Sequence, residues 1–168
     1  MSEKLFSLPP VEERWQEVQK LFLEALIRGD FREAQRLGEA HVATSEDVEA
    51  FYLNVLQASL YEVGRLWEEG WLSVAREHLA STIVSRLIST LYVRHGQGEI
   101  TKGRAIITAA PNEFHEIGAW MVANCLEQDG WDVSYLGANT PVDDLMALVE
   151  EVKPHLLGIS LAMPFNLE

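Results

Sequence analysis

The hydrophobic pattern of this chain changes its period near residue 100, and this change limits what the chain can fold into. In residues 10–95, apolar side chains recur every three or four positions, which predicts helices throughout. In residues 104–168, short apolar runs alternate with amphipathic stretches, which predicts strands alternating with helices. We therefore predict an α unit followed by an α/β unit, with these two ranges as the domains.

The first unit is predicted to be a four-helix bundle. Its helices are expected over residues 10–28, 31–43, 44–69 and 73–94. Gly29 breaks the first helix. Thr44 or Ser45 can cap the third helix, and Ser73 can cap the fourth. Because the loops are short, neighbouring helices are expected to run antiparallel in an up-down bundle.

The second unit alternates strand and helix in the order βαβαβ. Strands are expected over residues 104–110, 132–136 and 156–161, and helices over residues 115–129 and 141–152. This order predicts a parallel wound sheet of the flavodoxin-like or Rossmann-like kind, with right-handed crossovers. Thr140 is expected to cap the second helix, with Pro141 in its first turn. Wound ligand-binding sheets usually have more than three strands, so we expect this domain to be truncated, or to continue, after the third strand.

The charge of the chain argues against two classes of partner. The chain has 168 residues and a formal net charge of −13, from 13 basic and 26 acidic residues. Neither unit carries a basic stripe, so this segment is expected to bind neither nucleic acid nor an anionic membrane. No apolar run approaches the roughly 20 residues that span a bilayer, and the N-terminus lacks the apolar core of a signal peptide. A soluble cytoplasmic protein is the expectation.

The segment Glu113-Phe-His115-Glu-Ile-Gly118 follows the first predicted strand, where open α/β sheets bind ligands. His115 can coordinate a metal through one ring nitrogen while Glu113 accepts a hydrogen bond from the other. Gly118 removes a side chain where a flat ligand would approach the backbone. A lone histidine at this position can also be a local cap. No second histidine or cysteine stands at zinc-like spacing, so a single protein ligand suggests a metal that brings its own macrocycle.

Two further groups of residues stand out. Glu77 lies on the apolar stripe of the fourth helix with His78 on its flank, and Trp67 precedes Glu77 by ten positions. They can face a ligand held against the bundle. Alternatively, Glu77 pairs with an arginine or reaches solvent, and the indoles of Trp67 and Trp71 fill the core, as Trp15 is expected to do.

Small and hydroxylated residues end the second and third strands. The loop Gly137-Ala-Asn-Thr-Pro141 follows the second strand, and Ser160 ends the third at the same edge as His115. Together they make a slot for a long polar ligand tail, although each is also ordinary turn chemistry.

These motifs resemble those of a known family. Glu113-x-His115-x-x-Gly118 is similar to the Asp-x-His-x-x-Gly signature of cobalamin-binding domains of the methionine synthase type, with glutamate in place of aspartate. Ser160 stands where that family has the serine of its Ser-x-Leu motif, and Ala162 stands where it has leucine. In the bundle, Trp67 followed after nine residues by Glu77-His78 resembles the signature of CarH-type adenosylcobalamin photoreceptors.

The resemblance implies that a cobalamin lies between bundle and sheet. His115 would bind cobalt from below, Glu113 would support His115, and Trp67 would cover the upper ligand. The residues implied to contact the cofactor are Trp67, Val74, Glu77, His78, Glu113, Phe114, His115, Glu116, Ile117, Gly118, Gly137, Asn139, Thr140, Ser160 and Ala162.

Three functions are compatible with these residues. The first is a non-enzymatic light sensor with an adenosylcobalamin chromophore, which signals to a downstream protein, to a missing output domain or through a homo-oligomer. The second is an enzyme component, a corrinoid methyl carrier that uses methylcobalamin or another corrinoid. The third is a degenerate domain that serves only for protein interaction.

Overall fold

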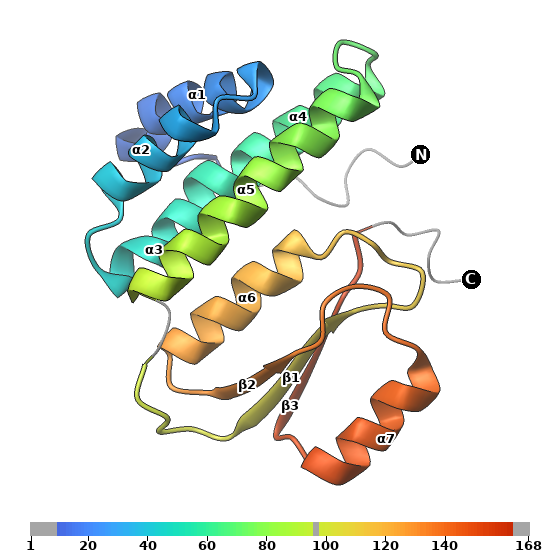
Figure 1. Cartoon of the computed structure of the whole chain (residues 1–168). Coiled ribbons are helices and arrows are strands. Elements are labelled where there is room, and N and C mark those ends of the chain that lie inside the picture. The colour runs from blue at the N-terminus through green and yellow to red at the C-terminus, as the bar shows by residue number, and fades with distance from the viewer. Residues whose placement is uncertain (1–9, 96–97, 163–168) are drawn as a thin grey trace. The chain divides into compact units, whose positions relative to one another are not determined.

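The structure, a computed structural model, describes residues 10–95 and 98–162 (Figure 1). Its contacts divide the chain into two compact units, with the boundary between Leu91 and Tyr92. The predicted fold class is confirmed, because a helical region is followed by a three-stranded parallel sheet. Within the described ranges, no helix combines the length and apolar composition that crossing a membrane would require.

The helical unit follows the predicted order, with small shifts of the helix ends. Its elements are α1 Glu13–Arg28, α2 Phe31–His41, α3 Ser45–Phe51, the π-helix η1 Tyr52–Gln57, α4 Ala58–Glu68 and α5 Val74–His95. The first helix begins at Glu13, three residues later than predicted. Ser73 caps α5 as expected, because its Oγ accepts a hydrogen bond from the backbone N–H of Arg76 at 3.3 Å.

The predicted third helix is continuous but contains the π-helical segment η1 between α3 and α4. Asn54 lies in this segment and is 9% exposed. Its Oδ1 accepts a hydrogen bond from the backbone N–H of Glu12 at 2.9 Å, and its Nδ2 donates to the carbonyl of Ala50 at 2.9 Å. Asn54 therefore ties the start of α1 to the middle of the long helical run.

Aromatic edge-to-face contacts join α1 to α3. The ring centroids of Phe22 and Phe51 are 5.9 Å apart, and those of Trp15 and Phe51 are 6.0 Å apart. Trp15 is buried, which confirms its predicted place in the core. Helix α5 packs closely on α2, because a Cβ atom at Gly38 would lie 2.9 Å from Cδ1 of Leu87. Burial of these side chains is the main source of stability in this unit.

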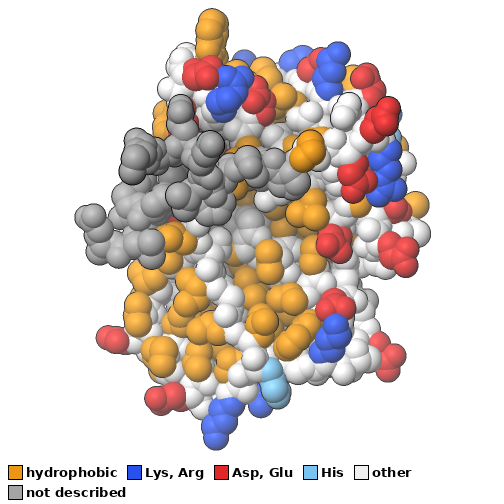
Figure 2. Space-filling model, turned by 180° about the vertical axis from the view of Figure 1, so that it is seen from behind, with side chains coloured by type: hydrophobic (Ala, Val, Ile, Leu, Met, Phe, Trp, Pro, Cys, Tyr) orange, Lys and Arg blue, Asp and Glu red, His pale blue; other side chains and the backbone are white. Residues whose placement is uncertain are grey.

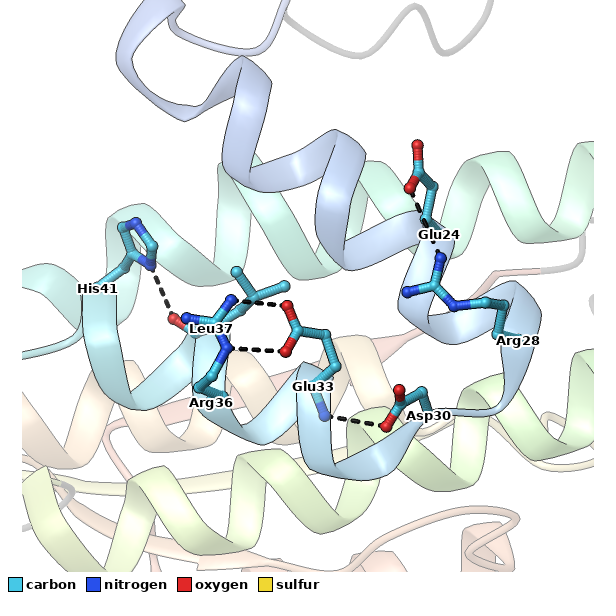
Figure 3. A network of polar contacts seen from close by, with 7 residues as sticks. All are labelled: Glu24, Arg28, Asp30, Glu33, Arg36, Leu37 and His41. Carbon is cyan, nitrogen blue, oxygen red and sulfur yellow. Dashed lines mark hydrogen bonds and ion pairs between the residues drawn. The ribbon is translucent and has the colours of Figure 1, made fainter.

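The surface of α1 and α2 carries a set of short-range polar contacts (Figure 3). Asp30 caps α2 by accepting a hydrogen bond from the backbone N–H of Glu33 at 3.1 Å. Arg36 pairs with the carboxylate of Glu33 at 2.6 Å, and Arg28 pairs with Glu24 at 3.6 Å. Exposed pairs of this kind contribute about 0–1 kcal/mol each, so they order the helix ends rather than hold the unit together.

The second unit is a three-stranded parallel sheet with two crossover helices. Its elements are β1 Arg104–Ala109, α6 Ile117–Gln128, β2 Asp132–Tyr135, α7 Val142–Val152 and β3 Leu156–Ser160. The strand order is β2-β1-β3, so β1 is central. The two crossovers run in opposite directions from each other, and right-handed crossovers then place α6 and α7 on opposite faces, as Figure 1 shows. The carboxyl ends of the three strands therefore share one edge.

Helix α6 covers one face of this sheet. Ile107 of β1 packs with Ala119 and Ala123 of α6, and partly buried side chains surround this cluster: Leu126, Val133, Tyr135 and Leu156. The small alanines let the helix approach the sheet closely. This packing fixes the position of the start of α6. It therefore also positions His115, which lies two residues before that helix.

Strand β3 lies at one edge of the sheet and is less buried than β1. Leu157 and Ile159 are exposed, as are Val142 and Met146 of α7. Figure 2 shows hydrophobic side chains gathered on the surface of this unit. The predicted truncation or continuation after the third strand concerns residues 163 onward, which lie outside the described residues.

We expect Asn54→Ala to lower the free energy of unfolding by about 1–2 kcal/mol, because it removes two side-chain hydrogen bonds, one to the backbone N–H of Glu12 and one to the carbonyl of Ala50. Urea denaturation followed by circular dichroism measures this change. Leu53→Ala is the matched control, since Leu53 lies in the same π-helical segment but is 52% exposed. A change within about 0.5 kcal/mol is expected for the control. Equal effects of the two substitutions would contradict the role given to Asn54.

Candidate functional site

The loops that follow β1 and β2 are tied to each other by reciprocal hydrogen bonds. The backbone N–H of Asn112 donates to Oδ1 of Asn139 at 2.8 Å. The backbone N–H of Asn139 donates to the carbonyl of Glu113 at 3.0 Å. Both asparagines have a left-handed backbone, with φ of 64° and 53°, which asparagine tolerates better than most residues. The two loops therefore form one pre-shaped edge above the sheet.

Glu113 is fully buried in this edge. Its Oε1 accepts hydrogen bonds from Nδ1 of His115 at 2.6 Å and from the backbone N–H of His115 at 2.9 Å. Its Oε2 accepts from the backbone N–H of Ala162 at 2.9 Å. The glutamate therefore reaches His115 despite its extra methylene, and it also connects His115 to the segment that follows β3.

This contact favours the tautomer of His115 that metal ligation through Nε2 requires. A carboxylate accepts hydrogen bonds, so Nδ1 donates to Glu113, and in the neutral ring Nε2 then carries the free electron pair. The His115 side chain is 58% exposed, so a ligand can reach it. His115 lies before α6, which begins at Ile117 rather than at residue 115 as predicted. The site thus fits a cofactor that takes one axial nitrogen from the protein.

Gly118 in the first turn of α6 gives a second test of this fit. A Cβ atom placed on Gly118 would meet nothing within 4 Å. Its backbone φ is not in the left-handed region, and a glycine inside a helix costs about 1 kcal/mol relative to alanine. Nothing in the packing of the described residues calls for glycine here. The open space over Gly118 is what a flat ligand lying on the backbone would need.

The Gly137–Thr140 loop is held from below by a residue that sequence reasoning missed. Thr108 is fully buried in β1, and its Oγ1 lies 2.8 Å from Oγ1 of Thr140 and 3.2 Å from the carbonyl oxygen of Gly137. The predicted capping of α7 by Thr140 is wrong: the helix begins at Val142 with Pro141 at the N-cap. The hydroxyl of Thr140 bonds to Thr108 instead. A threonine inside an otherwise apolar strand was the signal for this contact.

Ser160, Phe114 and Glu116 are the next predicted residues of this unit, and each lies in a different environment. Ser160 ends β3, and its carbonyl accepts a hydrogen bond from the backbone N–H of Ala110 at 2.9 Å. Phe114 is 70% exposed beside His115. Glu116 is the N-cap of α6, and its carbonyl and Oε2 lie 3.2 and 3.5 Å from the hydroxyl of Tyr135. Sequence reasoning missed Tyr135, which looked like an ordinary strand residue.

In the helical unit, Glu77 and His78 of α5 contact each other. Nδ1 of His78 lies 2.5 Å from Oε2 of Glu77, and the hydroxyl of Ser81 donates to Oε1 of Glu77 at 2.7 Å. The alternative in which Glu77 pairs with an arginine is therefore wrong for this structure. The Glu77 side chain is 26% exposed and that of His78 is 74% exposed, so the pair lies at the surface of its unit.

Trp67 and Trp71 are exposed, by 40% and 77%, and so is Val74, by 52%. The alternative in which these two indoles fill the core is wrong. Large apolar side chains exposed close together in sequence often mark a binding surface. The predicted residues thus lie on both units, with Glu113 and His115 in contact on one and Glu77 and His78 in contact on the other, and the placement of Trp67 over His115 stays a prediction.

Family comparisons cover both units. Residues 18–92 match a family described as B12 binding domain, and residues 103–168 match a second family with the same description.

The curated relatives comprise repressors and corrinoid proteins. The chain is 37% identical to the HTH-type transcriptional repressor CarH of Myxococcus xanthus over 111 residues, which cover 63% of this chain and 35% of the repressor. It is 32% identical to CarA of the same organism, over 70% of this chain and 38% of CarA. Dimethylamine corrinoid protein 2 of Methanosarcina mazei is 26% identical over 68% of this chain and 55% of that protein. The chain therefore spans only about a third to a half of these relatives.

A solved structure agrees with the fold. The monomethylamine corrinoid protein of Methanosarcina barkeri matches with a TM-score of 0.76 at 18% identity, over 91% of this chain and 73% of that one. Together with the matched families and the CarH relationship, this likeness gives the identity of the fold. The chain belongs to the B12-binding family, with one B12 binding domain in residues 18–92 and a second in residues 103–168, and it is similar to CarH.

Proposed function

We propose that this chain binds adenosylcobalamin and serves as a light-sensing domain that signals to a partner, to a second copy or to an output domain. The observation that carries the proposal is the contact of buried Glu113 with His115, at 2.6 Å, which presents Nε2 as an axial ligand. Residues Phe114, Glu116, Ile117 and Gly118 would line the lower face. Gly137, Asn139, Thr140, Ser160 and Ala162 would line the slot for the nucleotide tail.

The residues of the helical unit support the choice of adenosylcobalamin among the corrinoids. Trp67, with Glu77 and His78 ten and eleven positions later, matches the resemblance to CarH-type photoreceptors. The exposure of Trp67 and Val74 leaves both available to cover an upper ligand. The 37% identity to CarH points in the same direction.

Adenosylcobalamin, when bound, supplies a cobalt–carbon bond that visible light breaks. The chain's own residues bind, orient and shield. His115 would supply an electron pair from Nε2, and Glu113, by accepting a hydrogen bond from Nδ1, would favour the tautomer in which this pair is available. Trp67 would exclude water from the upper side. A signal requires that the protein's conformations bind the dark and illuminated cofactor with different free energies.

A corrinoid methyl carrier is the second candidate. The identity of 26% to dimethylamine corrinoid protein 2 favours it. Such a carrier would use the same His115 with methylcobalamin. It would be an enzyme component, whereas the light sensor is not an enzyme. The two candidates differ in which upper ligand the helical unit prefers.

The decisive experiment mixes the purified protein with adenosylcobalamin in the dark. We expect the protein to keep the colour through gel filtration and its absorption spectrum to change under green light. His115→Ala should lose most of the colour, while His155→Ala, at the opposite ends of the strands, should keep it. Binding of methylcobalamin in preference to adenosylcobalamin would favour the methyl carrier instead.

We expect Trp67→Ala to reduce the preference for adenosylcobalamin over hydroxocobalamin by roughly tenfold, because an indole is a large apolar contact surface. Titrations followed by absorption give both affinities. Trp71→Ala is the matched control, since Trp71 is an exposed indole of the adjoining loop. Its preference should remain that of the wild type. Loss of preference in both variants, or in neither, would speak against Trp67 as the cover.

We expect Gly118→Ala to stabilise the cofactor-free protein and to weaken cobalamin binding. Alanine reduces the conformational entropy of the unfolded chain, which stabilises the folded state by about 0.4–1 kcal/mol. In the folded state its methyl group meets open space. The same methyl group would hold a flat ligand away from the backbone. Urea denaturation measures the first effect and cobalamin titration the second. Unchanged affinity would show that the ligand does not lie on Gly118.

A further inference from the structure

The carboxylate of Glu116 lies at the edge of the candidate site, and the contact between Glu113 and His115 gives this carboxylate no role. Its Oε2 lies 3.5 Å from the hydroxyl of Tyr135, and a Cβ atom on Gly137 would come within 3.1 Å of this same oxygen. The carboxylate therefore stands between the loop that follows β1 and the loop that follows β2. Within the described residues, its Oε1 has no hydrogen-bond partner.

Tyr135 keeps this carboxylate in place. Its ring stacks on Trp120 of α6, with centroids 6.3 Å apart and an angle of 13° between the planes. Burial raises the pKa of the Tyr135 hydroxyl, and the negative charge of Glu116 raises it further. The hydroxyl thus stays protonated at neutral pH, and its single proton is shared between the carbonyl oxygen of Glu116 at 3.2 Å and Oε2 of Glu116 at 3.5 Å. This support limits the freedom of a side chain that would otherwise move in solvent.

The electrostatics of the edge favour neutral donors over anions. Glu113 and Glu116 are acidic, and residues 110–116, 137–141 and 160–162 contain no lysine or arginine. A carboxylate accepts hydrogen bonds, so it attracts an amide N–H₂ group and repels a second carboxylate. The rim of a cobalamin carries neutral amides, whereas corrins that are incompletely amidated carry carboxylates at the same positions.

We propose that Glu116 is a specificity-determining residue, whose carboxylate accepts a hydrogen bond from an amide on the rim of the corrin and thereby discriminates against corrins with a carboxylate at that position. This inference rests on the proposed binding of cobalamin. It adds a preference among corrinoids that His115 alone cannot provide, because axial ligation does not sense the rim.

The test compares cobalamin with its monocarboxylic acids, in which each propionamide of the rim is hydrolysed in turn. Affinities come from absorption titrations at low and high salt. For at least one acid, the wild type is expected to bind roughly tenfold more weakly than cobalamin, and the difference should shrink at high salt. Glu116→Gln keeps the size of the side chain and an acceptor for Tyr135 but removes the charge. It should bring the two affinities within about threefold.

A second variant tests whether the charge of Glu116 or only its fixed position matters. Tyr135→Phe removes the hydroxyl that contacts Glu116 but leaves the charge, so the proposal expects the preference for cobalamin over the acid to persist at reduced size. Equal affinity of the wild type for cobalamin and for every acid would overturn the inference while leaving the proposed function intact. A preference that persists unchanged in Glu116→Gln would also overturn it. Failure of the wild type to bind any corrin would overturn the proposed function, and this inference with it.

Discussion

The candidate site depends on one buried carboxylate. An ionised side chain without exposure to water is costly unless hydrogen bonds compensate for the lost hydration. Glu113 obtains these bonds from His115 and from the backbone of Ala162. The same bonds set the tautomer of His115 and join the loop after β1 to the segment after β3. The hydrogen bonds of Glu113 therefore serve both the proposed ligation by His115 and the local fold, so a substitution of Glu113 is expected to affect both.

The two units contribute different kinds of surface to the proposed function. The sheet edge is polar and held by hydrogen bonds, among them those of Thr108 and Asn139. The helical unit presents exposed Trp67 and Val74, and it carries a surface Glu77–His78 pair. Exposed apolar side chains gain free energy when they are covered.

Much of this architecture could be predicted from the pattern of residues. Every predicted helix and strand exists, because apolar periodicity reflects directly which faces are buried. The errors lie at element ends, in polar partners and in the burial of two indoles. Thr140 was assigned to a helix cap, yet its hydroxyl meets Thr108, which lies 32 positions earlier. Trp67 and Trp71 were open to a core role that their exposure contradicts. Such contacts depend on which loops meet in space, and local spacing carries little information about that.

The sequence by itself determined the class of fold, the order of its elements and the motif around His115 on which the proposed ligation rests. It did so because helical and strand periods, and a motif of residues close together in the chain, are local properties. Tertiary structure alone decided that Glu113 would be buried, that its second oxygen would bind the backbone of Ala162, and that Tyr135 would support Glu116. These relations join segments far apart in the chain, and only the packing of the parallel strands brings their carboxyl ends to one edge.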